Sequence, residues 1–429
     1  MTQPPAVVRA MAIAAGIPAE DLPRLRRRMR WVLFMVAALG STGYFAAVTV
    51  GTLVAAELSG GPALGGLPTT TTTIGTAVAS SLIALVMLRA GRRRGLLLGL
   101  AVGVLGGAVV FGSVLAASIP LLLLGSAFTG FANAAGNLGR YIAADMATPN
   151  RRASALGLVV WGTTVGAVVG PVLTAPAGQL ALAVGAPELA GPYLFTVVFI
   201  GLAWIVSAVL LRPEPYALAD PSALPTELDT HVDGPAVRSI VARPSVAVSL
   251  VTLVAAQVVM VLIMTMTPIH LTDHGHGLET VGLVISAHTF GMFGLSPITG
   301  RLTDRFGAPL VIAAGLVGLA LAALLAALAP PDGGFGLTLA LFLLGYGWNL
   351  CFVAASSMLS TGLTLAERTR VQGVADTLTW GTAAFASLSS GLVVAAASYT
   401  ILGFVGLGLT LIPAAFLAVQ GGRLRPAAA

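Results

Sequence analysis

Methionine and histidine gather in one short part of the sequence, residues 260–277, which reads MVLIMTMTPIHLTDHGHG. It contains three of the eleven methionines and three of the five histidines of the chain. Eleven residues later, residues 288–292 read HTFGM. Thioether and imidazole groups are ligands that suit Cu(I), whereas a hard cation prefers oxygen. These stretches raise the hypothesis of a soft-metal site, with ordinary helix residues and a polar turn as the alternative.

The spacing of these residues matches an α-helix. Met260 and Met264 are four residues apart, as are His288 and Met292, so each pair lies on one face of its helix. Counted from the predicted outer helix ends, Met264 would lie about 9 Å deep, Met260 and His288 about 15 Å, and Met292 about 21 Å. The four side chains would form a ladder of modest sites along which an ion can move. Methionine is also a common gap-filler in packed helices, and this is the structural alternative.

The composition indicates an integral membrane protein. Hydrophobic residues make up 57% of the 429 residues and charged residues only 9%, against about 25% in soluble proteins. All 22 basic residues are arginine, and most of them lie between apolar stretches or next to their ends. This placement is typical of a membrane protein and not of a nucleic-acid-binding surface. The one cysteine, Cys351, excludes an intrachain disulfide and a CxxC motif.

Apolar stretches of about 20 residues predict an all-α membrane protein with twelve transmembrane helices in two six-helix halves. The predicted spans are 31–57, 68–89, 96–117, 119–146, 154–182, 192–211, 245–270, 279–299, 309–328, 336–360, 371–396 and 400–420. The predicted organisation is a cytoplasmic segment 1–30, a first half 31–211, a linker 212–243, a second half 244–420 and a tail 421–429.

The connections between spans predict the orientation of the chain. Those that follow odd-numbered spans contain no arginine, and the opposite side carries the arginines, so both termini are predicted to be cytoplasmic. A weak internal repeat also relates the two halves. NRRASALGLVVWGTT before the fifth span matches RTRVQGVADTLTWGTA before the eleventh, and half-repeats of this kind are a transporter architecture.

The octapeptide GRLTDRFG at 300–307, in the turn predicted after the eighth span, resembles the G-x-x-x-D-R-x-G loop signature of the major facilitator superfamily. The equivalent loop after the second span keeps Arg92 but has Leu88 where the family has aspartate. The resemblance implies a twelve-helix alternating-access transporter, in which Asp304 and Arg305 belong to a cytoplasmic gate. The alternative for Asp304 is a carboxylate that only caps and neutralises a loop.

Few other charged residues are predicted within the spans. Asp376 would lie about 9 Å inside the cytoplasmic end of the eleventh span, where it could serve in ion coupling. No carboxylate is predicted at the midplane, and His288 is the other candidate for a proton carrier. Arg140, in the fourth span, is interpreted as structural, either snorkelling or paired with an acidic residue.

The fifth span contains GTTVGAVVGP, which resembles the antiporter motif of drug-exporting members of the superfamily. Glycine every fourth residue, at Gly162, Gly166 and Gly170, also lets two helices approach closely, and we favour this packing interpretation.

The MxxxM and HxxxM motifs in the seventh and eighth spans are similar to the paired motifs of CcoA-like copper importers, a branch of the superfamily. The spacing between the motifs also agrees with that branch. The resemblance implies that Met260, Met264, His288 and Met292 bind copper, and that copper is imported into the bacterial cytoplasm for assembly of heme–copper oxidases. The same branch includes members that carry other cargo, such as riboflavin.

The outer turn after the seventh span contains His270, His274 and His276, and histidine-rich tracts bind metals. They are predicted as a metal entry site, against the alternative of a polar turn. The expected partners are the copper ion, the lipid bilayer and cytoplasmic copper acceptors. We expect no resident cofactor and no nucleic-acid partner, and we expect a monomer in the bacterial inner membrane. The alternative function is a proton-coupled antiporter for drugs or small molecules, whose cavity would be lined by Trp348, Asn349, Tyr346, Trp380 and Tyr44.

Overall fold

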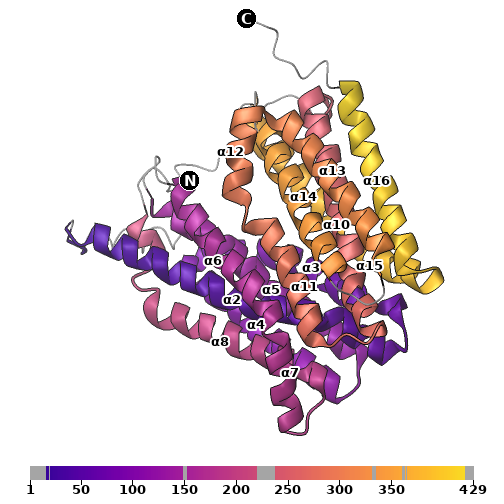
Figure 1. The fold of residues 1–429 in the computed structure, drawn as a ribbon. Helices are drawn as coiled ribbons and strands as arrows, with labels where there is room; N and C mark the ends of the chain where they lie inside the picture. Colours follow the sequence, from indigo (N-terminus) through magenta and orange to yellow (C-terminus); the bar gives the residue numbers. More distant parts are fainter. Residues whose placement is uncertain are drawn as a thin grey trace, which may run out of the picture. The chain divides into compact units, whose positions relative to one another are not determined.

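The computed structural model describes residues 16–18, 20–147, 152–219, 237–330, 335–359, 363 and 365–420 (Figure 1). In these ranges, twelve helices are long and apolar enough to cross a membrane, and no strand is present. The predicted all-α fold with twelve spans is therefore confirmed. Most of the predicted N-terminal segment, the middle of the predicted linker and the whole predicted tail lie outside the described residues.

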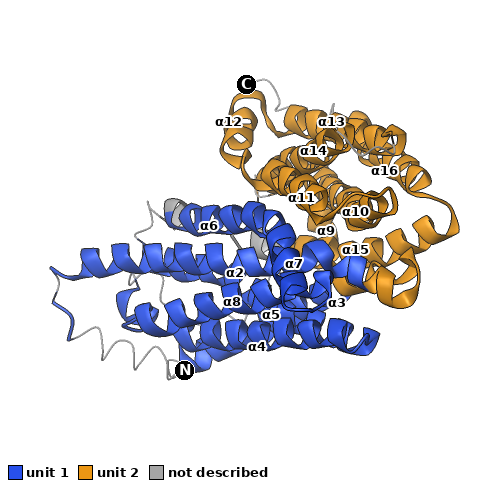
Figure 2. Ribbon diagram, turned by 60° about the horizontal axis from the view of Figure 1, so that its bottom comes forward, with its two compact units in different colours: residues 1–54, 71–228 blue, residues 55–70, 229–429 orange. Residues whose placement is uncertain are grey.

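The chain divides into two compact units, residues 1–54 with 71–228 and residues 55–70 with 229–429 (Figure 2). The helices up to the division near residue 228 are α2 (Leu22–Ser59), α3 (Leu67–Ala90), α4 (Arg92–Leu115), α5 (Ile119–Asp145), α6 (Arg152–Val172), α7 (Thr174–Ala183) and α8 (Gly191–Leu210), with short 3₁₀ turns at Pro62–Leu64, Glu188–Ala190 and Pro215–Leu218. The later helices are α9 (Val237–Val241), α10 (Pro244–Asp273), α11 (Leu278–Phe293), α12 (Ser296–Phe306), α13 (Ala308–Leu328), α14 (Phe335–Leu359), α15 (Leu365–Ala396) and α16 (Tyr399–Gln420).

In the first unit, the glycines of the fifth span pack directly against α2. A Cβ atom on Gly162, Gly166 or Gly170 would overlap the backbone carbonyl oxygen of Phe34, Ala38 or Thr42, respectively. Only glycine allows this approach along the whole contact, so the packing interpretation of the glycine repeat is confirmed.

In the second unit, α10 is the most enclosed of the candidate spans. Of its most apolar window, 72% is buried, against 28% for α16. Helix α10 packs against α14, α15 and α16, and α14 also packs against α11 and α13. The arrangement of α10, α11 and α14 is visible in Figure 1. Side chains on α10 therefore lie mostly among other helices of the unit. A polar side chain there has a higher free-energy cost than one at a surface.

Two predicted spans are interrupted helices, which corrects the sequence prediction. The span predicted at 154–182 consists of α6 and α7, with Leu173 between them and Pro171 at the end of α6. The span predicted at 279–299 consists of α11 and α12, which are separated at residues 294–295. Helix α12 continues to Phe306, so most of the loop signature is helical and not a turn. Proline lacks the N–H that an unbroken helix needs, and each interruption lies close to a proline.

Candidate functional site

The methionines of the seventh span lie inside the second unit. Met260 is buried and Met264 is half-buried on α10. Met266, two residues further on, is fully buried. Met260 and Met266 are therefore not adaptations to the lipid surface, and for them the choice that remains is between packing and ligand binding.

His288 has the hydrogen-bonding arrangement of a metal-binding histidine. Its side chain is completely buried on α11, and Nδ1 lies 2.9 Å from the carbonyl oxygen of Leu341 on α14. Because a carbonyl oxygen only accepts hydrogen bonds, Nδ1 carries the proton, and in the neutral ring Nε2 then holds a lone pair. Nε2 is buried and has no hydrogen-bond partner among the described residues. A backbone carbonyl on one ring nitrogen, with the other nitrogen free, is the usual support of a histidine ligand.

The methionine face of α10 is turned toward α14. Gln257 on α10 accepts a hydrogen bond of 2.8 Å from the indole nitrogen of Trp348 on α14. Met260 and Met264 follow Gln257 by three and seven residues, so they lie on the same face of α10.

The second motif also contacts α14, through the side chain of His288 and the backbone of Met292. The backbone carbonyl of Met292 accepts a hydrogen bond of 2.7 Å from the side-chain amide of Asn349 on α14. Helix α14 is therefore a third helix of the candidate site. The two motif spacings indicated a ladder made by α10 and α11 alone, and nothing in them indicated α14.

The observed helix ends also change the predicted levels along the ladder. Helix α10 continues to Asp273 rather than ending near residue 270, and α11 begins at Leu278. Counted from these ends, Met264 and His288 are each about 14–15 Å along their helices. Met260 and Met292 are each about 20–21 Å along. By this count along the helices, Met264 rather than Met260 is expected at the level of His288, and Met260 at the level of Met292.

The predicted entry histidines gather at the end of α10. The His270 ring stacks on Tyr399 with centroids 4.1 Å apart, and it lies 4.4 Å from the His274 ring. His276 is half-buried, and its Nε2 has no hydrogen-bond partner among the described residues. No three His, Cys, Asp or Glu side chains in the described part of the chain form a group that could hold a metal ion. The cluster is thus a set of separate imidazoles and not a closed metal centre.

The predicted gate and coupling residues are exposed in the structure. Asp304 and Arg305 lie in the last turn of α12, and the Arg305 guanidinium lies 5.2 Å from the ring centroid of Phe306. Asp304 is therefore not at the N-terminus of α12, where the helix dipole would favour its charge. Asp376 is exposed on α15. The role of each residue stays a prediction.

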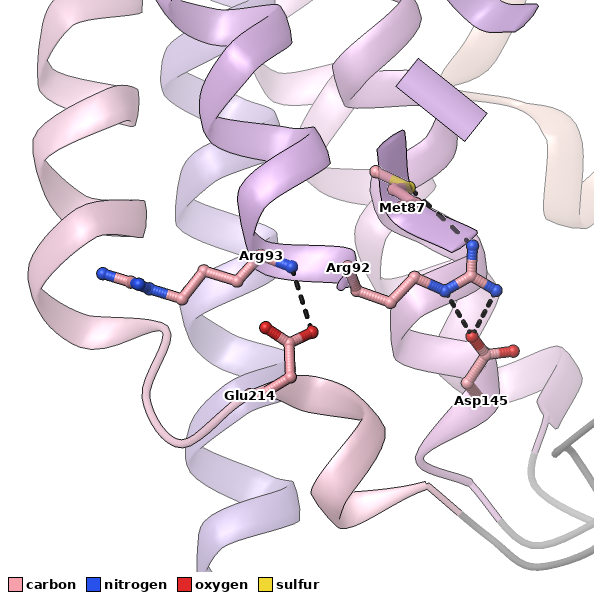
Figure 3. A network of polar contacts seen from close by, with 5 residues as sticks. All are labelled: Met87, Arg92, Arg93, Asp145 and Glu214. Carbon is pink, nitrogen blue, oxygen red and sulfur yellow. Dashed lines mark hydrogen bonds and ion pairs between the residues drawn. The ribbon is translucent and has the colours of Figure 1, made fainter. Parts of the chain in front are cut away.

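An ion pair that was not predicted lies at the first copy of the loop signature (Figure 3). Arg92, the first residue of α4, contacts Asp145, the last residue of α5, with Nη2 to Oδ2 at 2.7 Å and Nε to Oδ2 at 3.0 Å. The Arg92 guanidinium also lies 5.0 Å from the ring centroid of Tyr216. Both partners of the ion pair are only about one-fifth exposed, so this pair is better shielded from water than a surface pair. Arg140, for which the sequence left open snorkelling or pairing with an acidic residue, lies against Tyr141.

Glu214 places a carboxylate at the start of α4, although Leu88 occupies the aspartate position of the signature. It follows α8 in the chain, and its Oε1 accepts a hydrogen bond of 3.2 Å from the backbone N–H of Arg93 (Figure 3). Gly91 caps this helix with φ +106°, and a Cβ there would lie 2.9 Å from the Glu214 carboxylate. A carboxylate at a helix N-terminus is favoured by the helix dipole. The sequence offered one signal for this contact, an acidic residue two positions after Arg212, at the end of the sixth span.

We expect Glu214 to make stability depend on pH. Burial raises the pKa of its carboxyl above the ordinary 4.5, and the backbone N–H groups and the arginine charges nearby oppose that rise. The folded chain then holds this proton more tightly than the unfolded chain, so the stabilisation is present below pH 4.5 and is lost as pH rises through the raised pKa. Glu214→Gln cannot titrate. The melting temperature of the native protein should therefore fall relative to this variant as pH increases above 4.5.

The control for this measurement is Glu57→Gln, because Glu57 is exposed. Its melting curve should follow that of the native protein at every pH. Equal slopes for the native protein and Glu214→Gln would show that Glu214 does not titrate in this range.

Twelve apolar helices in two units define the described part of the chain as a multi-pass membrane protein. The model of the Major Facilitator Superfamily matches residues 31–388 and, in a second match, residues 248–427. The chain belongs to the Major Facilitator Superfamily, and it is a secondary transporter.

The chain is similar over nearly its whole length to proteins of this family. It is 37% identical to the uncharacterized MFS-type transporter YddS of Bacillus subtilis, over 92% of this chain and 91% of that protein. It is 33% identical to the riboflavin transporter RfnT of Brucella anthropi, over 85% of this chain and 88% of that protein. The crystal structure of the nucleoside transporter NupG matches with a TM-score of 0.70 and 15% identity, over 92% of this chain and 98% of that one, which shows the shared fold alone.

Proposed function

We propose that this transporter imports copper, bound as Cu(I), across the bacterial cytoplasmic membrane. The observation that carries the proposal is His288, a fully buried imidazole whose Nδ1 is held by a carbonyl and whose Nε2 has no partner among the described residues. A buried nitrogen lone pair without a partner is costly unless a ligand uses it. Met264 is level with this imidazole along the helices, and a thioether with an imidazole is a donor set suited to Cu(I).

The second level of the ladder supports movement of the ion. Met260 and Met292 lie about 6 Å further along their helices than Met264 and His288. Both are apolar thioethers, so they are inexpensive to bury when no metal is bound. Two weak levels in sequence let an ion enter and leave, as transport by alternating access requires.

The direction and orientation belong to the same proposal. The arginine-bearing connections predict that both termini lie in the cytoplasm, with the entry histidines His270, His274 and His276 on the outer side. Import is implied by the likeness of the two motifs to those of copper importers. The transporter would act as a monomer without a resident cofactor and would deliver copper to cytoplasmic acceptors. Asp304 and Arg305 would act at the gate and Asp376 in coupling.

A second candidate function is the transport of a small organic molecule such as riboflavin. It is favoured by the 33% identity to a protein named as a riboflavin transporter. In that case the free Nε2 of His288 would accept a hydrogen bond from the cargo. Trp348 and Asn349 were expected to line the cavity for such a molecule. They are only 7% and 2% exposed and form hydrogen bonds to neighbouring helices, so they support this candidate less than His288 does.

The test is uptake of radioactive copper by bacterial cells that lack their own copper importer. Met264→Leu conserves volume but removes the thioether. His288→Asn keeps a donor for the Leu341 carbonyl and removes the nitrogen that corresponds to Nε2. Each change should lower uptake at least about tenfold, at equal protein abundance in the membrane. Met266→Leu is the matched control on the same helix, because Met266 is fully buried but does not belong to the MxxxM motif. This variant should transport copper normally.

Uptake that is absent in the native protein, or unchanged in both variants, would refute the copper proposal. Riboflavin uptake is measured in the same strains in parallel. Riboflavin uptake by the native protein without copper uptake would favour the second candidate, and its loss in His288→Asn would assign His288 to that cargo.

A further inference from the structure

The interruption of the eighth span follows the candidate site directly along the chain. Helix α11 ends at Phe293, one residue after Met292, and α12 begins at Ser296. Pro297 has no N–H to donate to the carbonyl of Phe293 at the end of α11. In an unbroken helix the carbonyl of Met292 would accept from the N–H of Ser296. A carbonyl released at such an interruption within a membrane must find another donor.

Asn349 on α14 supplies that donor and bridges the interruption. Its Nδ2 donates to the carbonyl of Met292 at 2.7 Å and to Oγ of Ser296 at 2.8 Å. Its Oδ1 accepts a hydrogen bond from Thr299 on α12. Asn349 is only 2% exposed, so its amide is almost entirely committed to these three bonds. One side chain thus holds the end of α11 and the start of α12 together.

The two helices are held against α14 in different ways. On α11, a Cβ at Gly291 would lie 2.5 Å from the carbonyl oxygen of Phe342, and one at Gly345 would overlap the carbonyl oxygen of His288. This backbone-to-backbone contact fixes α11 on α14. On α12, the buried residues are Thr299 and Thr303 alone. Helix α12 is therefore the part that can tilt with little loss of packing.

We infer that Asn349 is a positioning residue that latches a hinge at residues 294–295. When its bonds to Ser296 and Thr299 open, α12 tilts relative to α11, while the Met292 carbonyl stays bonded to Asn349. Because α12 carries Asp304 and Arg305, the tilt connects the level of the candidate site with the loop signature. The hinge does not depend on the cargo, and only its link to metal binding at Met292 rests on the proposed function.

The hinge is tested by distance measurements between spin labels, with the buried Cys351 replaced by alanine. One label replaces Leu283 on α11 and the other replaces Phe306 on α12, since both side chains are at least half exposed. A second pair at Leu310 and Leu321, both on α13, reports on a continuous helix. The purified full chain is measured without cargo, so the result does not depend on the transported substrate.

Asn349→Leu removes all three bonds at similar volume, and Asn349→Asp keeps an acceptor for Thr299 but loses the donors. In the native protein the 283–306 distance should form one population, with any minor state below about 10%. Both variants should raise a second population above about 10%, and Asn349→Leu more strongly. The α13 pair should not change. Gln257→Leu, which removes the bond of α14 to α10, is the matched control and should leave the hinge distance unchanged.

An unchanged 283–306 distribution in the folded Asn349 variants would overturn the inference. So would an equal broadening in Gln257→Leu, since this would indicate general loosening of α14. If copper uptake fails in the native protein while the Asn349 variants open the hinge, the hinge stands and the copper proposal falls. If copper is transported, Asn349→Leu should lower the maximal uptake rate by a larger factor than it changes the copper concentration for half-maximal uptake.

Discussion

Replacing Gly345 with leucine should prevent α14 from packing against α11 and lower the amount of folded protein in the membrane at least about tenfold. A Cβ at Gly345 would overlap the carbonyl oxygen of His288 and lie 3.0 Å from the backbone nitrogen of Met292. Because the obstacle is backbone of another helix, no rotamer change can relieve it. The two helices must separate, and the bonds of α14 to both His288 and Met292 would be lost.

The matched control is Gly336→Leu on the same helix. A Cβ at Gly336 meets no atom within 4 Å, so this variant introduces the same side chain on the same helix without the overlap. Fluorescence-detected size-exclusion chromatography of solubilised membranes measures the folded fraction of each variant. A Gly345→Leu protein that elutes and melts like Gly336→Leu would show that α11 and α14 are not in close backbone contact.

Charge reversal at Asp145 should have the second large effect. Asp145→Arg brings a second guanidinium against Arg92 in a place that is only about one-fifth exposed, and like charges that are poorly hydrated repel strongly. The native contacts of Arg92 with Asp145, at 2.7 and 3.0 Å, would be replaced by repulsion between the ends of α4 and α5. We expect loss of most folded protein. Asp145→Asn keeps an acceptor and should lose only about 1–3 kcal/mol.

A double variant tests whether the loss of the Arg92–Asp145 ion pair causes this loss of folded protein. Arg92→Glu combined with Asp145→Arg restores opposite charges and should recover part of the folded protein. Recovery should be incomplete, since glutamate cannot maintain the contact of Arg92 with the ring of Tyr216. The measurements are protein abundance in the membrane and melting temperature. Equal abundance of Asp145→Arg and Asp145→Asn would contradict a structural role for the ion pair.

The sequence by itself determined the class of fold. Apolar stretches of about 20 residues must become helices in lipid, because each backbone polar group has to be satisfied within its own segment. Twelve such helices are present in the described part of the chain. Helical periodicity also placed Met260 with Met264 and His288 with Met292 on shared faces, since that relation depends only on spacing along one helix.

The glycine repeat of the fifth span shows what local spacing predicts and what it does not. Gly162, Gly166 and Gly170 predicted a close helix contact, and the structure places that contact on α2. The spacing could not name the partner, because any helix with room for its backbone satisfies the same pattern.

Only the tertiary structure decided which groups meet at the candidate site. Helix α14 contributes the Leu341 carbonyl that orients His288 and the Asn349 amide that holds Met292. The expected levels of the ladder changed because α10 continues to Asp273. The Arg92–Asp145 pair joins residues 53 positions apart. Contacts between distant segments depend on which helices pack together, and no periodicity along one segment contains that information.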